Sequence, residues 1–311
     1  MTGSIRTDLQ PLTLRAAQAG ARAIREVRDD RRMVIEFKEG RSQDPVTTAD
    51  HASERAIREL IARDRGADSV QAEESGLAPG SSGLRWIIDP LDGTVNFSHG
   101  LSRYAVSVAV TREGLHGTVG DDPQVVAATI LQPATGAWLG LTAGGTTDTD
   151  SGTGTGPGVS TLDSAGRALV AFAVPNAPGP RRHAYRLLTD VAPQVQDLRN
   201  FGSTVCDLVA VATGELDAFV SFNPAPWDVA AGVALVEAAG GTSRRWRRRD
   251  GLTVIAAGAP GVVADLGHWL GAPPEPAALP GRPHHPGRPH HPGRPHHPGR
   301  PHHPGRPPQP S

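Results

Sequence analysis

Trp86-Ile87-Ile88-Asp89-Pro90-Leu91-Asp92-Gly93-Thr94-Val95-Asn96-Phe97 reads as a buried strand that stops abruptly at two carboxylates. The apolar run predicts the strand, and the proline and glycine that follow end it, so Asp89 and Asp92 leave a rigid edge in one direction. With the carbonyl of Leu91 between them, they are hard oxygen ligands that suit Mg²⁺ or Mn²⁺ better than Zn²⁺. Gly93 then predicts a helix start, where free backbone N–H groups favour a phosphate. The stretch therefore predicts that a metal and an anion meet at one spot.

Taken alone, an Asp-x-x-Asp pair is more often a solvated turn or a helix cap than a metal site. The chain carries further acids at the ends of expected helices and strands, which gives the set Asp50, Glu73, Asp89, Asp92 and Asp228. Burying several like charges together is costly unless cations neutralise them. Convergence of these five residues would therefore require bound metal.

The composition is that of an ordinary globular protein of 311 residues, 38% hydrophobic and 20% charged, which is long enough to bury a large core. A formal net charge of -1 gives no global field for nucleic acid or membrane, so neither is an expected partner. Cys206 is the single cysteine, which excludes an internal disulfide. We find no apolar run approaching the roughly 20 residues of a membrane span and no signal-peptide pattern, so we expect a cytoplasmic protein.

Hydrophobic periodicity predicts alternating helices and strands along the chain. Helices are expected at 8–27, 48–61, 182–191, 203–213, 226–239 and 261–270, and strands at 70–72, 86–88, 104–111, 124–131, 137–141, 168–174, 217–222 and 252–257. Asp50 and Asp228 fall in first turns, where an acid also stabilises a helix without any chemistry. Of the neighbours Glu73 and Glu74, only one can face a shared site, because adjacent strand side chains point to opposite faces.

Four other features have two interpretations each. Lys38 is the one lysine among 31 Lys plus Arg, so it is either kept for its compact charge or incidental. The arginine-rich segment 244–249, with one tryptophan, is either a solvated hairpin turn or a site for an anionic partner. Residues 142–159 are rich in Gly, Thr, Ser and Asp and predict a flexible surface loop. Residues 272–311 contain four Gly-Arg-Pro-His-His-Pro repeats and predict a disordered tail, whose paired histidines are either passive or weak Zn²⁺ or Ni²⁺ ligands.

Four segments, 44–54, 72–76, 86–100 and 227–241, resemble the signature segments of the inositol monophosphatase family of Mg²⁺-dependent, lithium-sensitive phosphatases. The resemblance covers most of residues 9–270 in the same order. It implies an α+β fold, a layered α-β-α-β-α sandwich over residues 1–271 of the type shared with fructose-1,6-bisphosphatase. It also implies a phosphoric monoester hydrolase that works as a homodimer on a small-molecule phosphate monoester.

The resemblance further implies roles for the acidic set. Glu73, Asp89 and the carbonyl of Leu91 would hold a first Mg²⁺, while Asp89, Asp92 and Asp228 would hold a second. A third, weaker ion would lie near Glu73, and Mn²⁺ is a possible substitute. In this assignment two ions bridge the phosphate and acidify the attacking water.

The remaining site residues also follow from the resemblance. Thr94 and Asp50 match the pair that orients and deprotonates the water, and Gly93 and Thr94 would donate backbone N–H groups to the phosphate. Lys38 stands near the position of a lysine that faces the site. On the substrate side, the expected residues are Asp92, Gly93, Thr94, Gly202, Ser203, Thr204, Ser221 and Asp228.

The expected reaction is hydrolysis of inositol 1-phosphate or a similar small polyol phosphate. Ser221 stands where inositol-specific members carry a glutamate that binds ring hydroxyls, so histidinol phosphate, fructose 1,6-bisphosphate and a 3',5'-bisphosphonucleotide remain alternatives. A function of another class is a regulatory interaction protein that binds its partner through segment 244–249 or the tail.

Overall fold

The computed structural model describes residues 9–30, 34–37, 45–112, 124–142, 147–149 and 157–274. The chain divides into a unit Met1–Pro273 and a second unit Pro274–Ser311. All helices and strands below belong to the first unit. Lys38, residues 143–146 and 150–156 of the expected loop, and nearly all of the expected tail lie outside the described residues. The loop prediction is wrong for Thr147–Thr149, which form a short strand at the edge of a sheet.

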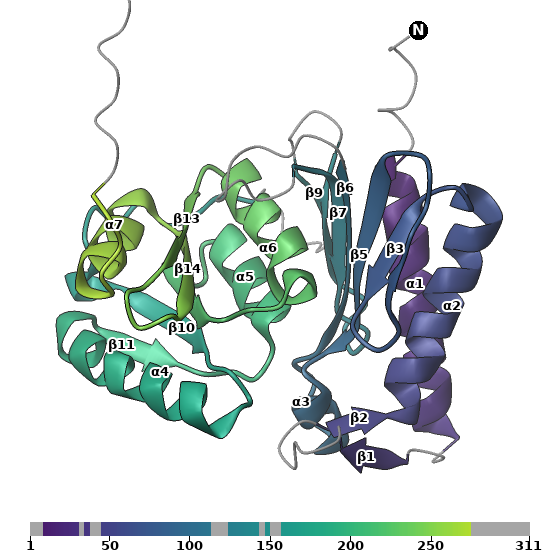
Figure 1. Ribbon diagram of the computed structural model, residues 1–311, viewed down its shortest axis with the longest axis horizontal. Coiled ribbons are helices and arrows are strands. Elements are labelled where there is room, and N and C mark those ends of the chain that lie inside the picture. The colour runs from purple at the N-terminus through teal and green to yellow at the C-terminus, as the bar shows by residue number, and fades with distance from the viewer. Residues whose placement is uncertain are drawn as a thin grey trace, which may run out of the picture. The chain divides into compact units, whose positions relative to one another are not determined.

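Two β-sheets and a small ribbon carry the strands (Figure 1). The seven-stranded sheet has the order β4 (Gly76–Ala78), β3 (Ser69–Ala72), β5 (Leu84–Asp92), β6 (Ala105–Arg112), β7 (Val125–Leu131), β8 (Trp138–Leu141), β9 (Thr147–Thr149). The five-stranded sheet has the order β11 (Asp197–Arg199), β10 (Leu169–Ala173), β12 (Ala218–Phe222), β14 (Thr253–Gly258), β13 (Thr242–Arg247). The antiparallel ribbon joins β1 (Ile35–Phe37) and β2 (Pro45–Thr47).

Helices cover both sheets in three layers. The α-helices are α1 (Leu9–Asp29), α2 (Thr48–Arg65), α3 (Thr94–Ser98), α4 (Pro178–Val191), α5 (Thr204–Ala212), α6 (Pro226–Ala238) and α7 (Pro260–Trp269). Figure 1 shows α1 and α2 on the outer face of the first sheet, α5 and α6 between the sheets, and α4 and α7 on the outer face of the second. The predicted α-β-α-β-α sandwich is confirmed.

Side chains of β5 and β6 divide between two hydrophobic cores, because successive strand residues point to opposite faces. Trp86 and Ile88 are fully buried in the core beneath α1 and α2. Ile87 and Ala109 lie in the core between the sheets. The helices there pack closely, since a Cβ on Gly232 of α6 would lie 2.5 Å from Leu208 Cδ1 of α5. These two strands, buried on both faces, thus separate the outer helices from those between the sheets.

Some elements differ from expectation. The arginine-rich segment is mostly strand, because β13 runs through Arg247 and the turn to β14 follows it. Helix α4 begins at Pro178, four residues before its expected start. The short strands β4 and β11 carry no alternating pattern long enough to detect, and their pairing to β3 and β10 defines them.

Candidate active site

The central feature is a bulge at the end of β5. Asp89 pairs with Ser107 of β6 but Asp92 pairs with Ala105, so β5 carries one extra residue between them. The carbonyls of Pro90 and Leu91 lie in this bulge and accept hydrogen bonds from side chains. Ser53 Oγ donates to Pro90 O at 2.7 Å, and a second hydroxyl donates to the carbonyl of Leu91. The bulge therefore turns both carboxylates and a carbonyl oxygen out of the sheet.

Gly93 follows the bulge and allows the chain to enter α3. Its φ is +88°, and a Cβ there would lie 3.0 Å from Arg103 O and 3.2 Å from Ser203 Cβ. A side chain at this position would have both a strained backbone and no room. The helix expected after Gly93 does begin at Thr94, although it is only one turn long.

Asp50 and Thr94 form a hydrogen-bonded pair next to the bulge. Thr94 Oγ1 lies 3.0 Å from Asp50 Oδ1 and 2.9 Å from Leu91 O. The other carboxylate oxygen of Asp50 accepts from Thr47 N and Thr47 Oγ1, both at 2.7 Å. Asp50 therefore stabilises the start of α2 as a capping residue and also contacts Thr94. Burial raises the pKa of Asp50, the Thr47 and Thr94 hydrogen bonds lower it in part, and the charge of Glu73 raises it further.

Four carboxylates act on one another electrostatically around Asp89. This residue is 2% exposed, and its pKa lies well above the ordinary value because of burial first, then the charges of Glu73, Asp92 and Asp228. Glu73 is brought there because β3 runs parallel to β5, and its N–H donates to Ile88 O at 3.2 Å. Asp228 comes from the first turn of α6. Residues far apart in the sequence thus form one crowded set of negative charge.

Each of these acids is held by its own hydrogen bonds. Asp228 Oδ2 accepts from Ala225 N at 3.0 Å, and Asp89 Oδ1 accepts from Leu91 N at 3.0 Å. Within the described ranges no three His, Cys, Asp or Glu side chains converge closely enough to form a finished metal cluster. The charges of Glu73, Asp92 and Asp228 nevertheless all act on Asp89. An all-oxygen set made of buried Asp89, three half-buried carboxylates and a carbonyl fits a hard divalent cation.

Asp92 connects the bulge to the start of α5. Its Oδ2 accepts a hydrogen bond from Ser203 Oγ and another from Val205 N at 3.0 Å. Ser203 is itself the N-cap of α5. Burial raises the pKa of Asp92 to about 6, the bonds from Ser203 and Val205 oppose the rise, and Glu73 adds to it.

The expected substrate side lies along the same junction. Gly202 has a φ of +81°, Ser203 is buried against Asp92, and Thr204 is the first residue of α5. Ser221 lies on β12 and is 4% exposed, opposite Ala173 of β10. Its short, buried side chain extends less far from the strand than a glutamate would.

Sequence reasoning missed three residues at this junction: Asn96, Arg103 and Asp207. Asp207 is 1% exposed and pairs with Arg103, whose Nη2 lies 2.9 Å from Asp207 Oδ1. Burial raises the pKa of Asp207 to about 7, and the hydrogen bond and charge of Arg103 oppose the rise. One signal was available, because Asp207 occupies the first turn of a predicted helix as Asp50 and Asp228 do.

The arginine-rich segment packs on the end of α7. Trp246 is 5% exposed and donates through Nε1 to Leu270 O at 3.3 Å, and Arg248 Nη1 donates to the same carbonyl. Arg244 Nη2 donates to Pro273 O. Cations near a helix C-terminus stabilise its unpaired carbonyls. Trp246 is thus a core residue rather than an exposed platform for stacking a base.

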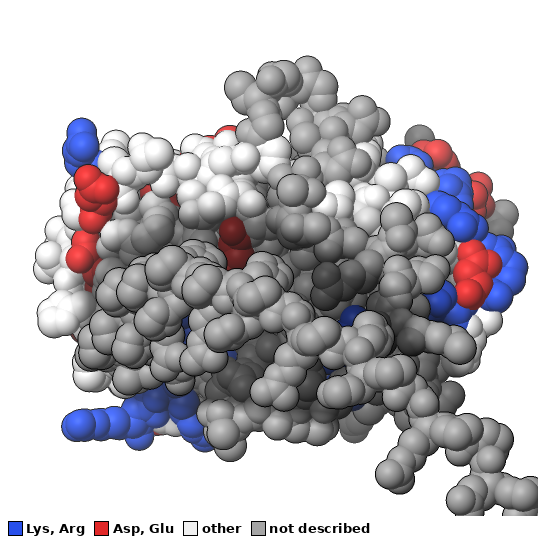
Figure 2. Space-filling view, turned by 90° about the horizontal axis from the view of Figure 1, so that it is seen from above, with Lys and Arg blue, Asp and Glu red and all other residues white. Residues whose placement is uncertain are grey.

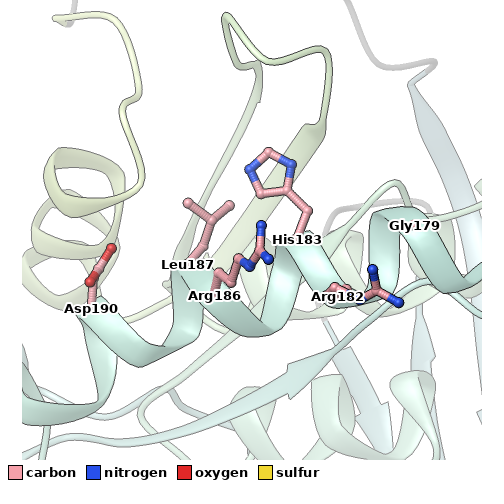
Figure 3. A pocket seen from close by; sticks show the side chains of 6 residues that line it. All are labelled: Gly179, Arg182, His183, Arg186, Leu187 and Asp190. Atoms are coloured by element: carbon pink, nitrogen blue, oxygen red, sulfur yellow. The ribbon is translucent and has the colours of Figure 1, made fainter.

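Two hollows on the described surface lie away from this site, one along α4 and one between α1 and α2. A hollow of about 390 Å³ runs along α4, lined by Gly179, Arg182, His183, Arg186, Leu187 and Asp190, and includes none of the expected site residues (Figure 3). On the face in Figure 2, described basic and acidic side chains lie close to one another at both ends of the view. Among the described residues, no helix is long and apolar enough to cross a bilayer.

Comparison with known proteins agrees with this architecture. Residues 8–269 match the Inositol monophosphatase family. The inositol-1-monophosphatase SuhB of Mycobacterium tuberculosis is 35% identical over 233 residues, which is 72% of this chain and 77% of that protein. The inositol-1-monophosphatase of Rhizobium meliloti is 34% identical over 203 residues, 64% of this chain and 71% of that protein.

Solved structures show the same fold. The extragenic suppressor protein SuhB from Bartonella henselae superimposes with a TM-score of 0.72 at 28% identity, covering 84% of this chain and 97% of that one. Mycobacterium tuberculosis SuhB gives a TM-score of 0.65 at 27% identity, covering 85% and 96%. With these matches, the five-layer fold and the acidic set at the β5 bulge, the chain belongs to the inositol monophosphatase family.

Proposed function

We propose that this protein is a Mg²⁺-dependent phosphomonoesterase that hydrolyses a small polyol phosphate, with inositol 1-phosphate as the first candidate. The observation that carries the proposal is the crowding of Glu73, Asp92 and Asp228 around buried Asp89. A bound divalent cation would relieve the repulsion within this set. Membership of a family of phosphoric monoester hydrolases, with relatives named inositol-1-monophosphatase, supports the reaction class.

The residues present fit two hard cations. Glu73, Asp89 and the carbonyl of Leu91 would hold one, and Asp89, Asp92 and Asp228 would hold the other, with a third, weaker ion near Glu73. When bound, such ions supply a Lewis acid for the phosphate and lower the pKa of a coordinated water. The bulge contributes by presenting these ligands from a rigid strand end.

Asp50 and Thr94 would handle the proton of the attacking water. When the Thr94 hydroxyl donates to Asp50 Oδ1 at 3.0 Å, the lone pairs of its oxygen are available to accept a hydrogen bond from a water. The proton can then pass through the hydroxyl to Asp50. Because burial raises the pKa of Asp50, this carboxylate takes a proton more readily than a solvated aspartate. Lys38, outside the described residues, stays a candidate that Lys38→Ala tests.

The alcohol part of the substrate would contact Gly202, Ser203 and Thr204, with Ser221 at the far side. Because Ser221 is small and uncharged, we propose a pocket that tolerates several alcohols. Histidinol phosphate, fructose 1,6-bisphosphate and a 3',5'-bisphosphonucleotide therefore belong in the same test.

We also propose a homodimer. Phe37 is 58% exposed and Leu101 is 56% exposed, and large apolar side chains such as these gain stability when a partner covers them. Light scattering coupled to size exclusion measures the mass directly.

The cytoplasmic location remains a prediction from the sequence.

The decisive experiment measures phosphate release from inositol 1-phosphate and the three alternatives, with Mg²⁺ and with a chelator. We expect release that requires Mg²⁺ and that is lost in Asp89→Asn. Asp190→Asn, an exposed aspartate on α4, is the matched control and should behave as wild type. Undiminished turnover in chelator, or no release from any of the four compounds, would refute the proposal.

A further inference from the structure

A single side chain joins two parts of the domain beside the proposed site. Asn96 of α3 is 7% exposed, and its Nδ2 donates to Arg103 O and to Phe201 O, both at 2.7 Å. Arg103 precedes β6 of the first sheet, while Phe201 leads into α5 between the sheets. An amide nitrogen has two hydrogens, so each carbonyl receives one and both donors are used.

Two glycines let these segments approach each other. A Cβ on Gly202 would lie 2.8 Å from Asn96 Oδ1, and a Cβ on Gly93 would lie 3.0 Å from Arg103 O. Both glycines have positive φ, +81° and +88°. The amide of Asn96 thus occupies the space that Gly202 leaves open, and Gly93 lets its own segment approach Arg103 and Ser203.

A second contact ties the same two segments. The Arg103 guanidinium donates to Asp207 Oδ1 from Nη2 at 2.9 Å and lies 4.3 Å from the centre of the Phe201 ring. Its charge is therefore shared between an acid of α5 and an aromatic ring just before α5. The start of α5 is fixed on both sides of Ser203.

The contacts of Asn96 and Arg103 act on Asp92 through Ser203. Ser203 Oγ and Val205 N donate to Asp92 Oδ2, and both donors sit in the segment that Asn96 and Arg103 fix. We propose that Asn96 is a positioning residue for the phosphatase reaction: by holding Phe201 against Arg103 it sets the α5 donors that orient the Asp92 carboxylate. The inference rests on the proposed function, because Asp92 is there a metal and substrate ligand.

A double-mutant cycle separates this role from general stabilisation. Asn96→Ala and Ser203→Ala should each lower kcat/KM about tenfold, since each removes hydrogen bonds on one route to a charged group. If Asn96 acts through Ser203, the double variant should also lose about tenfold rather than about a hundredfold. Asn200→Ala, an exposed asparagine nearby, should stay within about twofold of wild type.

Hydrogen exchange supplies a readout that needs neither Mg²⁺ nor substrate. In Asn96→Ala we expect faster amide exchange confined to residues 201–205, with the strands of both sheets unchanged. Multiplicative losses in the cycle, unchanged exchange at 201–205, or exchange raised throughout the domain would each overturn the inference.

Asn96→Ser is the second variant, in case Asn96→Ala does not fold. Its hydroxyl can serve only one of the two carbonyls, so the loss of kcat/KM should be smaller but again subadditive with Ser203→Ala. Failure of both variants to fold while Ser203→Ala folds would assign Asn96 a purely structural role and overturn the inference. Inactive wild-type protein would refute the proposed function itself and this inference with it, whereas active wild type with a fully active Asn96→Ala refutes this inference alone.

Discussion

Replacing Asp92 by asparagine should make the metal-free protein more stable while destroying its activity. An asparagine keeps an oxygen that can accept from Ser203 Oγ and Val205 N, but it removes the negative charge. The pKa of Asp92 is raised from 3.8 to about 6, so the ionised form is disfavoured in the folded protein. That shift corresponds to about 3 kcal/mol, and partial exposure of the carboxylate to water reduces it to about 2 kcal/mol.

The loss of stability from ionised Asp92 is complete above its raised pKa of about 6 and absent below the ordinary pKa of 3.8. Stability should therefore be measured at pH 8. Urea unfolding of wild type and Asp92→Asn in chelator should show the variant more stable by about 2 kcal/mol. Mg²⁺ at a hundred times its Kd should then stabilise wild type by about 2.7 kcal/mol and the variant far less. The order of stability should therefore reverse between chelator and Mg²⁺.

Two results would contradict this reasoning. One is a metal-free variant that is no more stable than wild type, which would mean that burial and the charge of Glu73 do not disfavour the ionised form of Asp92. The other is an equal gain from Mg²⁺ in both proteins, which would remove Asp92 from the ligands. Asp190→Asn, which loses an exposed charge on α4, is the control and should shift neither curve.

Three further perturbations test residues in and around the site. Burial raises the pKa of Asp207 from 3.8 to about 7. The contribution of protonated Asp207 to stability is therefore fully present below about pH 4 and is lost as the pH rises through 7. Asp207→Asn should flatten this decline in stability, measured as urea midpoints at pH 5 and pH 8. Thr94→Ala removes the hydroxyl that contacts Asp50, and we expect kcat to fall about a hundredfold with little change in KM, as phosphate-release kinetics will show. Asn223 has a φ of 49°, and its side chain accepts a hydrogen bond from Thr253 N at 2.7 Å. Asn223→Gly loses only this hydrogen bond and should lower the free energy of unfolding by about 1 kcal/mol, whereas Asn223→Ala adds backbone strain and should lower it by about 2 kcal/mol. A higher melting temperature for Asn223→Ala than for Asn223→Gly would exclude backbone strain as the cause.

Local patterns explain why so much of the fold was predictable. The apolar run at Trp86, with the proline and glycine that follow, indicated the strand and its abrupt end, and the structure adds that the end is a bulge. The strand expected at 104–111 is found as β6, whose alternating alanines and valines are buried on both faces. The parallel neighbour of β5 brings Glu73 rather than Glu74 into the field of Asp89. These features depend on residues within a few positions of one another.

Other parts of the site depend on contacts across more than a hundred residues. The pairing of Arg103 with Asp207 and of Asn96 with the carbonyl of Phe201 leaves no periodic signal in either segment. Nor does the sequence reveal that Asp92 is held by the start of α5. The arginine-rich segment was ambiguous for the same reason, because the end of α7 that its side chains cap lies outside any local window.

The single extra residue in β5 also limits how the chain can change its length. Ser107 and Ala105 of β6 lie two residues apart on one face of the sheet, and the extra residue of β5 lets Asp89 and Asp92, three residues apart, pair with them. Deleting one residue between the two acids would leave a regular ladder and remove the bulge that turns the carbonyls of Pro90 and Leu91 toward side-chain donors, and inserting one would lengthen the bulge and move the two acids apart. Apolar substitutions of similar size at Leu91 keep both the backbone carbonyl and the packing of this fully buried side chain, so they should be tolerated more often than any change in the spacing of the two acids. Insertions and deletions in this protein should therefore be excluded from that interval.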